Sequence, residues 1–229
     1  MKIKNVFLAS GLVLAATATS AADLSYNISA VTLYKASGVD QDYSTANDAG
    51  FDKATRPAIQ GGVDADLGGG LYVGNWNSTG EFGDASIEVD LYGGYAGELS
   101  GGLSYDVGYA HYVYPGQSDW NGGELYVSMS MAGLTAKITN GLNGSTKDGD
   151  NPKRRLSFTY DLAVSEAVGL SATYGVRNAA AGSFNDYALG MTYAMDDTLT
   201  FSATLAGGTN SAADAARTGR LILGVGTSF

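Results

Sequence analysis

The chain of 229 residues has no cysteine, and it contains only three prolines and one histidine. Without cysteine it can form no disulfide and offers neither a thiolate metal ligand nor a thiol nucleophile. A single histidine excludes most zinc sites, because these draw on several His and Cys ligands. Basic residues are also few, and a formal net charge of −10 argues against a nucleic-acid partner, whose phosphates attract a basic surface. We expect no cofactor and no bound metal.

Long apolar runs are missing from all but the start of the chain. Lys2 and Lys4 form a short basic segment, a mostly apolar run follows over residues 6–18, and small residues stand at Ser20 and Ala22. This pattern predicts a secretory signal peptide over residues 1–22, cleaved after Ala22 or after the preceding alanine. A membrane helix is the disfavoured alternative, because the run is too short to span comfortably. We therefore expect one exported unit over residues 23–229.

Two residue types are abundant, namely glycine with 33 copies and tyrosine with 15. The glycine share is about twice the usual value of roughly 7%. So many tyrosines argue against disorder, which is poor in aromatic residues. Glycine in or beside strands permits bends and bulges. The composition is that of a glycine-rich β protein.

Most of the mature chain alternates between apolar and polar residues. Residues 87–92 and 125–131 are clear cases, and no comparable segment has a helical period over several turns. Alternation with period two is the mark of a strand with one apolar face. We predict twelve strands, at residues 24–34, 57–66, 70–77, 86–96, 102–112, 122–131, 133–140, 154–162, 168–177, 185–194, 198–206 and 219–229.

The connections between these strands also alternate, in length. Short links follow the even-numbered strands, and mostly longer, polar links follow the odd-numbered ones, the first over residues 35–56. Short turns at one end and long loops at the other are typical of an outer-membrane barrel. Closure is required because lipid cannot satisfy an open sheet edge. We predict an all-β, closed antiparallel transmembrane β-barrel of about 12 strands with both termini periplasmic, over a soluble sandwich.

The end of the chain agrees with this prediction. Residues 221, 223, 225, 227 and 229 share one face of the last strand, and Phe229 is the final residue. An alternating apolar strand that ends in Phe resembles the C-terminal signal of bacterial outer-membrane proteins. We therefore interpret Phe229 as the signal for the barrel-assembly machinery and place the protein in the cell outer membrane. Outer-membrane lipid and lipopolysaccharide are then expected partners. The basic run 153–155 either contacts lipopolysaccharide phosphates or is solvated.

Aromatic residues near strand ends suit the interfacial girdles of such barrels. We expect an outer girdle and an inner one; the outer would hold Tyr112, Tyr114, Trp120 and Trp76, and the inner Tyr95 and Tyr193.

If the apolar positions face lipid, the opposite positions face the lumen. Acids then come mainly from the earlier strands and bases from the later ones, which would set up a field across the bore, and rings of charge decide the selectivity of pores. Glycines 108, 175, 190, 224 and 226 are expected to leave space in that bore. The alternative is that the charges pair and plug the lumen. The predicted pore-lining residues are Glu88, Asp90, Glu124, Lys137, Arg155, Arg177, Asp186 and Arg220.

The function predicted from these features is an outer-membrane porin-like channel for passive diffusion of small hydrophilic solutes or ions. A closed structural or surface-binding barrel without transport is the alternative. The remote alternative, an outer-membrane lipid hydrolase, depends on His111, which has lipid-facing parity. A serine nucleophile would have to lie beside it, but the next strand offers Leu125 with the same parity, so we predict no enzyme.

Two groups of loop acids could supply oxygen ligands for calcium. Asp40 and Asp42 form one group, and Asp148 and Asp150 form the other. Neither continues into the spacing of a calcium-binding EF-hand loop. We expect both groups to be solvated.

Several segments of the N-terminal half, within roughly residues 32–128, carry a resemblance to a known family. They are residues 57–64, 70–78, 88–95, 105–109, 112–116 and 124–126. In this order they resemble the TorF-type porins of proteobacteria. This resemblance implies a small outer-membrane barrel of porin type. One departure concerns the first loop, where that family usually has Arg-Gly and this chain has Ser37 before Gly38.

Overall fold

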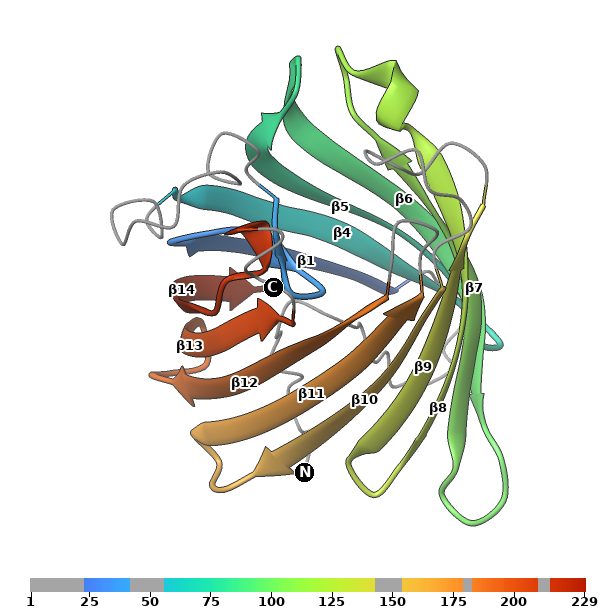
Figure 1. The fold of residues 1–229 in the computed structure, drawn as a ribbon. Helices are drawn as coiled ribbons and strands as arrows, with labels where there is room; N and C mark the ends of the chain where they lie inside the picture. The colour runs from blue at the N-terminus through green and yellow to red at the C-terminus, as the bar shows by residue number, and fades with distance from the viewer. Residues whose placement is uncertain (1–22, 42–55, 143–153, 179–182, 210–214) are drawn as a thin grey trace.

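A computed structural model describes residues 23–41, 56–142, 154–178, 183–209 and 215–229. The predicted signal peptide and the acids at 42, 148 and 150 lie outside these ranges. Twelve strands form a closed barrel in which each strand pairs with its neighbours in antiparallel fashion (Figure 1). β1 closes the ring by pairing with both β14 and β4. The predicted fold class is confirmed.

The barrel strands and the smaller elements have the following bounds. The strands of the ring are β1 (Asp23–Val31), β4 (Ala58–Gly68), β5 (Leu71–Phe82), β6 (Ala85–Glu98), β7 (Ser104–Val113), β8 (Gly122–Met131), β9 (Leu134–Gly141), β10 (Arg154–Ala163), β11 (Val168–Asn178), β12 (Phe184–Ala194), β13 (Leu199–Gly208) and β14 (Arg220–Ser228). A separate two-stranded sheet consists of β2 (Lys35–Ala36) and β3 (Val39–Asp40), and the 3-10 turns are η2 (Ser118–Trp120) and η3 (Ala215–Arg217). In the described part of the chain, no helix is long and apolar enough to cross a membrane.

All twelve predicted strands are present, and two of them differ clearly in length. β1 ends at Val31 because the chain then turns into the barrel, where Leu33 is only 1% exposed. β5 continues to Phe82 and pairs with Ala85 across Gly83 and Asp84, so the long connection predicted there is a two-residue turn. Gly83 has φ +67°, which favours glycine. The β5–β6 hairpin consequently projects beyond β4, together with the connection between β7 and β8 (Figure 1).

The outer face of the ring is apolar and the inner face is polar, which is the reverse of the distribution in a soluble protein. Large apolar side chains such as Leu91, Phe158 and Leu223 are 45% to 50% exposed on the outside, while Asp64 and Asp186 are at most 2% exposed inside. Soluble proteins bury their apolar side chains and expose their charges. An apolar exterior around a polar interior is the arrangement of a barrel immersed in lipid.

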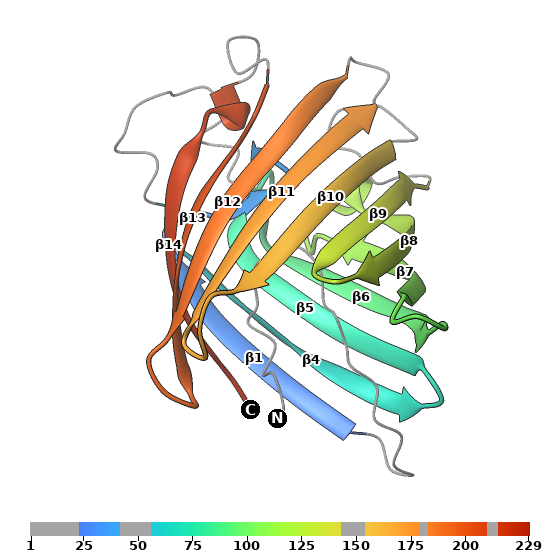
Figure 2. The same ribbon diagram turned by 90° about the horizontal axis from the view of Figure 1, so that it is seen from below.

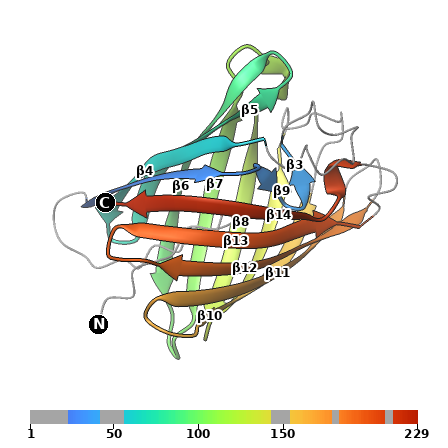
Figure 3. The same cartoon turned by 90° about the vertical axis from the view of Figure 1, so that its left-hand side faces the viewer.

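Both ends of the described chain lie at the end of the barrel that carries the short turns (Figure 3). Asp23 pairs with Asp66 close to the β4–β5 turn, and Thr227 pairs with Leu199 close to the β12–β13 turn. Beyond the last strand, the Phe229 amide donates to the Tyr26 carbonyl (2.9 Å), and the Tyr26 amide donates to the Phe229 carbonyl (3.1 Å). The C-terminal residue thus takes part in closing the ring.

Candidate functional site in the barrel lumen

The eight residues predicted to line a pore all lie on the inner face of the ring. Asp90, for example, alternates with Leu91, and Arg155 alternates with Leu156, both of which are exposed apolar side chains. Their exposure differs: Glu88, Asp186 and Arg220 are at most 5% exposed, whereas Glu124, Lys137 and Arg177 are half-buried. Inward orientation follows from strand parity. That these residues line a path for solutes stays a prediction.

The inner charges are sorted by strand. Acids stand on β6 and β8, bases on β9, β10, β11 and β14, and Asp186 on β12 is the exception. This exception has a partner, because Arg155 donates two hydrogen bonds to Asp186, from Nε (2.9 Å) and from a terminal nitrogen (2.6 Å). A bidentate arginine–carboxylate pair is among the strong charge-assisted contacts. The alternative reading of paired lumen charges therefore holds at this point of the wall.

Glycine makes this ion pair possible. Arg155 stands on β10 and Asp186 on β12, so the two side chains meet across β11, at Gly175. A Cβ atom on Gly175 would lie 2.5 Å from the Asp186 carboxylate and 2.7 Å from Arg155 Nε. Any side chain at this position would separate the pair.

The same arrangement recurs twice on the acidic wall. Tyr72 on β5 and Tyr126 on β8 meet with hydroxyl oxygens 2.5 Å apart, and Tyr72 also donates to Asp106 (2.6 Å). Between these tyrosines lie Gly94 and Gly108, at which a Cβ would collide with the two hydroxyls. In the third case, Tyr92 donates to Asp64 across Gly74.

The expectation that lumen glycines leave open space is thus wrong for Gly108 and Gly175. Their space is filled by side chains from the flanking strands, which bond to each other over the glycine backbone. Aromatic side chains that cover a strand glycine are a known device for holding the register of a curved sheet. The inner glycines permit bridges between strands that are not neighbours.

We expect Gly108→Ala to lower the free energy of unfolding by about 1–3 kcal/mol, the usual cost of inserting a methyl group into a filled space. The added methyl would push Tyr126 away from Tyr72. Urea unfolding of the barrel in lipid vesicles measures this. Gly93→Ala is the control, since it adds its methyl on the outer face with the nearest atom 3.1 Å away. Equal losses in the two variants would contradict the account.

A hairpin made of β2 and β3 lies inside the ring of strands (Figures 1 and 2). Its turn is formed by Ser37 and Gly38, with φ +47° and +79°, the left-handed values that two-residue hairpin turns require. A Cβ on Gly38 would lie 2.6 Å from the Asp186 Cβ and 2.6 Å from the Gly207 carbonyl oxygen. The tip of the hairpin therefore rests directly on the wall formed by β12 and β13.

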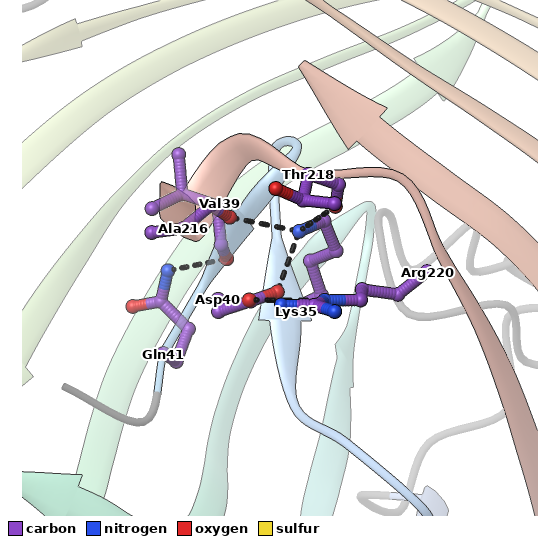
Figure 4. A network of polar contacts seen from close by, with 7 residues as sticks. All are labelled: Lys35, Val39, Asp40, Gln41, Ala216, Thr218 and Arg220. Carbon is purple, nitrogen blue, oxygen red and sulfur yellow. Dashed lines mark hydrogen bonds and ion pairs between the residues drawn. The ribbon is translucent and has the colours of Figure 1, made fainter. Parts of the chain in front are cut away.

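The hairpin is fastened by a buried lysine (Figure 4). Lys35 Nζ donates to Asp40 Oδ1 (2.5 Å), to the Ala216 carbonyl (2.8 Å) and to the Thr218 carbonyl (3.0 Å). Arg220 Nε lies 3.6 Å from the other Asp40 oxygen, and the side chains of Lys35 and Asp40 are 0% and 1% exposed. Burial raises the pKa of Asp40, and the Lys35 ammonium, followed by Arg220, opposes this shift. The network ties the first long connection to the last one.

The structure corrects the expectation for Asp40, which is buried and ion-paired instead of solvated. The physical reason is that residues 33–41 fold inward, so the carboxylate faces Lys35 across the hairpin. A signal was present in the sequence: Ser-Gly marks a turn, and the residues that pair two steps out from it carry opposite charges. The role of Lys35 was not predicted, because residues 35–56 as a whole have the composition of a polar loop.

Two aromatic residues expected in the outer girdle point inward instead. Trp76 and Tyr112 are the strand partners of Asp90, and all three lie on the inner face. The Trp76 ring packs edge-on against Tyr34 at 5.5 Å between centroids, and the Tyr112 hydroxyl donates to Glu124 (3.4 Å). Strand parity decides the matter, since Trp76 shares the face of Tyr72.

The other girdle aromatics differ in their surroundings. Tyr95 and Tyr193 are 46% and 48% exposed on the outer face, as an interfacial position requires. Tyr114 and Trp120 pack against each other in the connection between β7 and β8, with ring centroids 6.0 Å apart. Burial raises the pKa of Tyr34, and the nearby Glu88 and Asp90 carboxyl groups add to this shift.

His111 lies on the outer face, where its Nδ1 is 3.1 Å from the Tyr109 hydroxyl. Its strand partners are Leu91 and Gly123, neither of which carries a hydroxyl group. In the described ranges, no three His, Asp or Glu side chains gather as a metal site would require. The absence of enzyme activity stays a prediction.

The profile of a family described as "Bacterial protein of unknown function (Gcw_chp)" matches residues 15–222. The chain belongs to this family. No curated protein sequence matches it.

Solved structures with a similar fold include outer-membrane porins. A KdgM porin superposes with a TM-score of 0.60 at 9% identity, covering 90% of this chain and 99% of that one. A KdgM porin in complex with disordered oligogalacturonate gives 0.57 at 9% identity, covering 90% and 98%. A NanC porin gives 0.56 at 12% identity, covering 89% and 98%. At these identities the similarity establishes the barrel fold of this Gcw_chp protein.

Proposed function

We propose that this Gcw_chp protein is an outer-membrane channel through which small hydrophilic solutes or ions diffuse passively. The observation that carries the proposal is a closed ring of twelve strands that is apolar outside and charged inside. Charged side chains on the inner face of a barrel favour water there and act on passing ions. The residues proposed to line the path are the eight inner residues described above.

The comparisons support this proposal at the level of the fold. KdgM and NanC are porins, and one KdgM structure holds oligogalacturonate. The resemblance of residues 32–128 to TorF-type porins points in the same direction. We propose small hydrophilic solutes as a class for this chain, without naming one.

The proposed location has further consequences. Outer-membrane lipid would surround the apolar face, and lipopolysaccharide would meet the long-loop end, where Arg154 is exposed. Both termini would then be periplasmic, since they share the short-turn end. A cleaved signal peptide over residues 1–22 would direct export.

Solute uptake into liposomes tests the proposed function. The purified protein, shown to be folded by its heat-modifiable mobility on gels, is reconstituted at known density. Vesicles are diluted into isotonic solutions of neutral sugars of increasing size, and swelling is recorded. We expect swelling with the smallest sugars that declines with solute size. Swelling no faster than that of protein-free vesicles, with every solute tested, would contradict the proposal.

Phe229→Ala tests the proposed assembly signal. This variant keeps the backbone hydrogen bonds to Tyr26 and loses only a ring that is 70% exposed. We expect a several-fold loss of assembled barrel in cells and little change in refolding in detergent, because only the assembly machinery reads the ring. Leu223→Ala, on the same outer face, is the control. A loss that is equal in cells and in detergent would assign Phe229 a structural role instead.

A second candidate function, a closed structural or surface-binding barrel, is favoured by one observation. The β2–β3 hairpin and the Tyr72–Tyr126 bridge both occupy the interior. The two candidates separate in the liposome experiment, since a closed barrel folds and inserts but admits no solute.

A further inference from the structure

We propose that residues 34–38 form a crossbar inside the barrel that narrows the proposed channel and confines solutes to the side lined by Glu124, Lys137 and Arg177. This inference rests on the proposed function, because a constriction has meaning only in a conducting barrel. It goes beyond that function by locating the narrow point and the residues that act there.

The two ends of the crossbar touch walls that are far apart in the ring. At one end, the Tyr34 ring packs against Trp76 on β5, with centroids 5.5 Å apart, and against Phe82 at 6.4 Å. At the other end, the Gly38 backbone lies against Asp186 on β12 and Gly207 on β13. Between β5 and β12, the ring holds β6 to β11 on one side and β4, β1, β14 and β13 on the other. The segment therefore spans the lumen.

The two sides of the crossbar differ in how far their inner side chains are covered. On the side of β1, β4 and β14, Leu33 is 1% exposed, Arg220 is 5% exposed, and Gln60, also 5% exposed, donates to Ser78 (3.1 Å). On the side of β8 to β11, Glu124, Lys137 and Arg177 are half-buried. A path for solutes fits the side whose charges still meet solvent.

The tip of the crossbar lies at the same level of the barrel as a row of inner residues on this second side. Lys137, Ser157, Gly175 and Asp186 are successive strand partners across β9 to β12. Asp186, at one end of this row, touches Gly38, and Lys137 stands at the other end. The charged side chains of this row lie at the level of the crossbar, so they would act on a passing ion where the path is narrowest.

The Lys35 network keeps the crossbar in place. Lys35 lies within the segment and donates to two carbonyls of the β13–β14 connection. If the hairpin moved away, buried charges of this network would lose their partners, which is costly. The hairpin is therefore favoured in its position against the β13–β14 connection. The crossbar is thus held at both ends and in its middle.

A single thiol gives the most direct test, because the chain has no cysteine of its own. Ser37→Cys places a thiol on the crossbar at a half-buried position, and Ser100→Cys places one in the exposed β6–β7 turn as the control. Both are reconstituted in planar bilayers and exposed to a bulky charged methanethiosulfonate. We expect the single-channel current of Ser37→Cys to fall by most of its value and that of Ser100→Cys to stay unchanged.

Displacing the crossbar is expected to have the opposite effect. Gly38→Val adds a side chain where a Cβ would already meet the β12–β13 wall, so the hairpin tip must move off. We expect a larger single-channel current and faster uptake of larger sugars. Gly101→Val shares the strain of a positive φ but meets nothing within 4 Å, and should conduct like the unchanged protein.

The side chosen by solutes is tested by two matched carboxylates. Glu124→Gln is expected to shift the reversal potential in a salt gradient, whereas Asp64→Asn, on β4 at the covered side and 1% exposed, is expected to leave it unchanged. Suppose that the protein without substitutions conducts, and that neither labelling of Ser37→Cys nor Gly38→Val changes the single-channel current. This result would overturn the crossbar and leave the proposed function standing. A folded barrel that does not conduct at all would overturn both.

Discussion

Asp186→Asn is expected to destabilise the barrel by about 3–5 kcal/mol, the usual cost of breaking a buried ion pair by removing one partner. The Arg155 and Asp186 side chains are 12% and 3% exposed, and they share two hydrogen bonds across Gly175. Without the carboxylate, Arg155 stays buried directly opposite Arg177, its partner in the β10–β11 register. Urea unfolding in lipid vesicles measures the loss.

An exposed ion pair provides the matched control. Arg56 and Glu81 lie 3.1 Å apart with side chains 42% and 54% exposed. Exposed pairs contribute at most about 1 kcal/mol, so Glu81→Gln should change little. The double variant Arg155→Met with Asp186→Asn should recover much of the loss, because no buried charge is then left alone. A loss for Asp186→Asn no larger than that for Glu81→Gln would contradict the assigned role of the pair.

Neutralising Glu88, Asp90 and Glu124 together is expected to move the ion selectivity of the proposed channel toward anions. A charge about 8 Å from an ion in water acts on it with about 0.5 kcal/mol, which changes the local ion concentration roughly twofold. The reversal potential in a KCl gradient measures the shift, in alkaline buffer so that the carboxyl groups carry charge. If the crossbar is as proposed, Glu124 accounts for most of the effect.

The control for this experiment removes the same charge elsewhere. Asp84, Asp119 and Glu98 are exposed in or near the connections, and their conversion to amides should leave the reversal potential unchanged. Equal shifts in the two triple variants would mean that net charge alone decides selectivity. No shift in either would reject the assignment of Glu88, Asp90 and Glu124 to the path.

The strands could be predicted from the sequence because one physical demand repeats along them. Every strand of a barrel in lipid needs an apolar outer row and can keep a polar inner row, so period two is visible even in single segments such as residues 87–91. The same parity predicts an inner position for Arg155, which bonds to Asp186 on the inner face. The outer-girdle prediction was wrong for Trp76 and Tyr112, because it gave residue type more weight than strand parity.

The contacts inside the barrel could not be predicted in this way. Arg155 and Asp186 are 31 positions apart, and whether they meet depends on the register of three strands and on the glycine between them. Lys35 finds its carbonyl acceptor 181 residues further along the chain. The hydrophobic periodicity of the sequence contains no information on such pairs, because the partners of an inward-folded loop are far away in the sequence.

Single-channel recording in planar bilayers tests the central claim most directly. The purified, heat-modifiable barrel is added to one side of a bilayer in molar KCl, and the current is followed at fixed voltage. The account predicts discrete, reproducible steps that fall when a thiol at position 37 is labelled and rise in Gly38→Val. A folded and inserted barrel that yields no current steps would contradict the proposal that the polar lumen is a path for solutes.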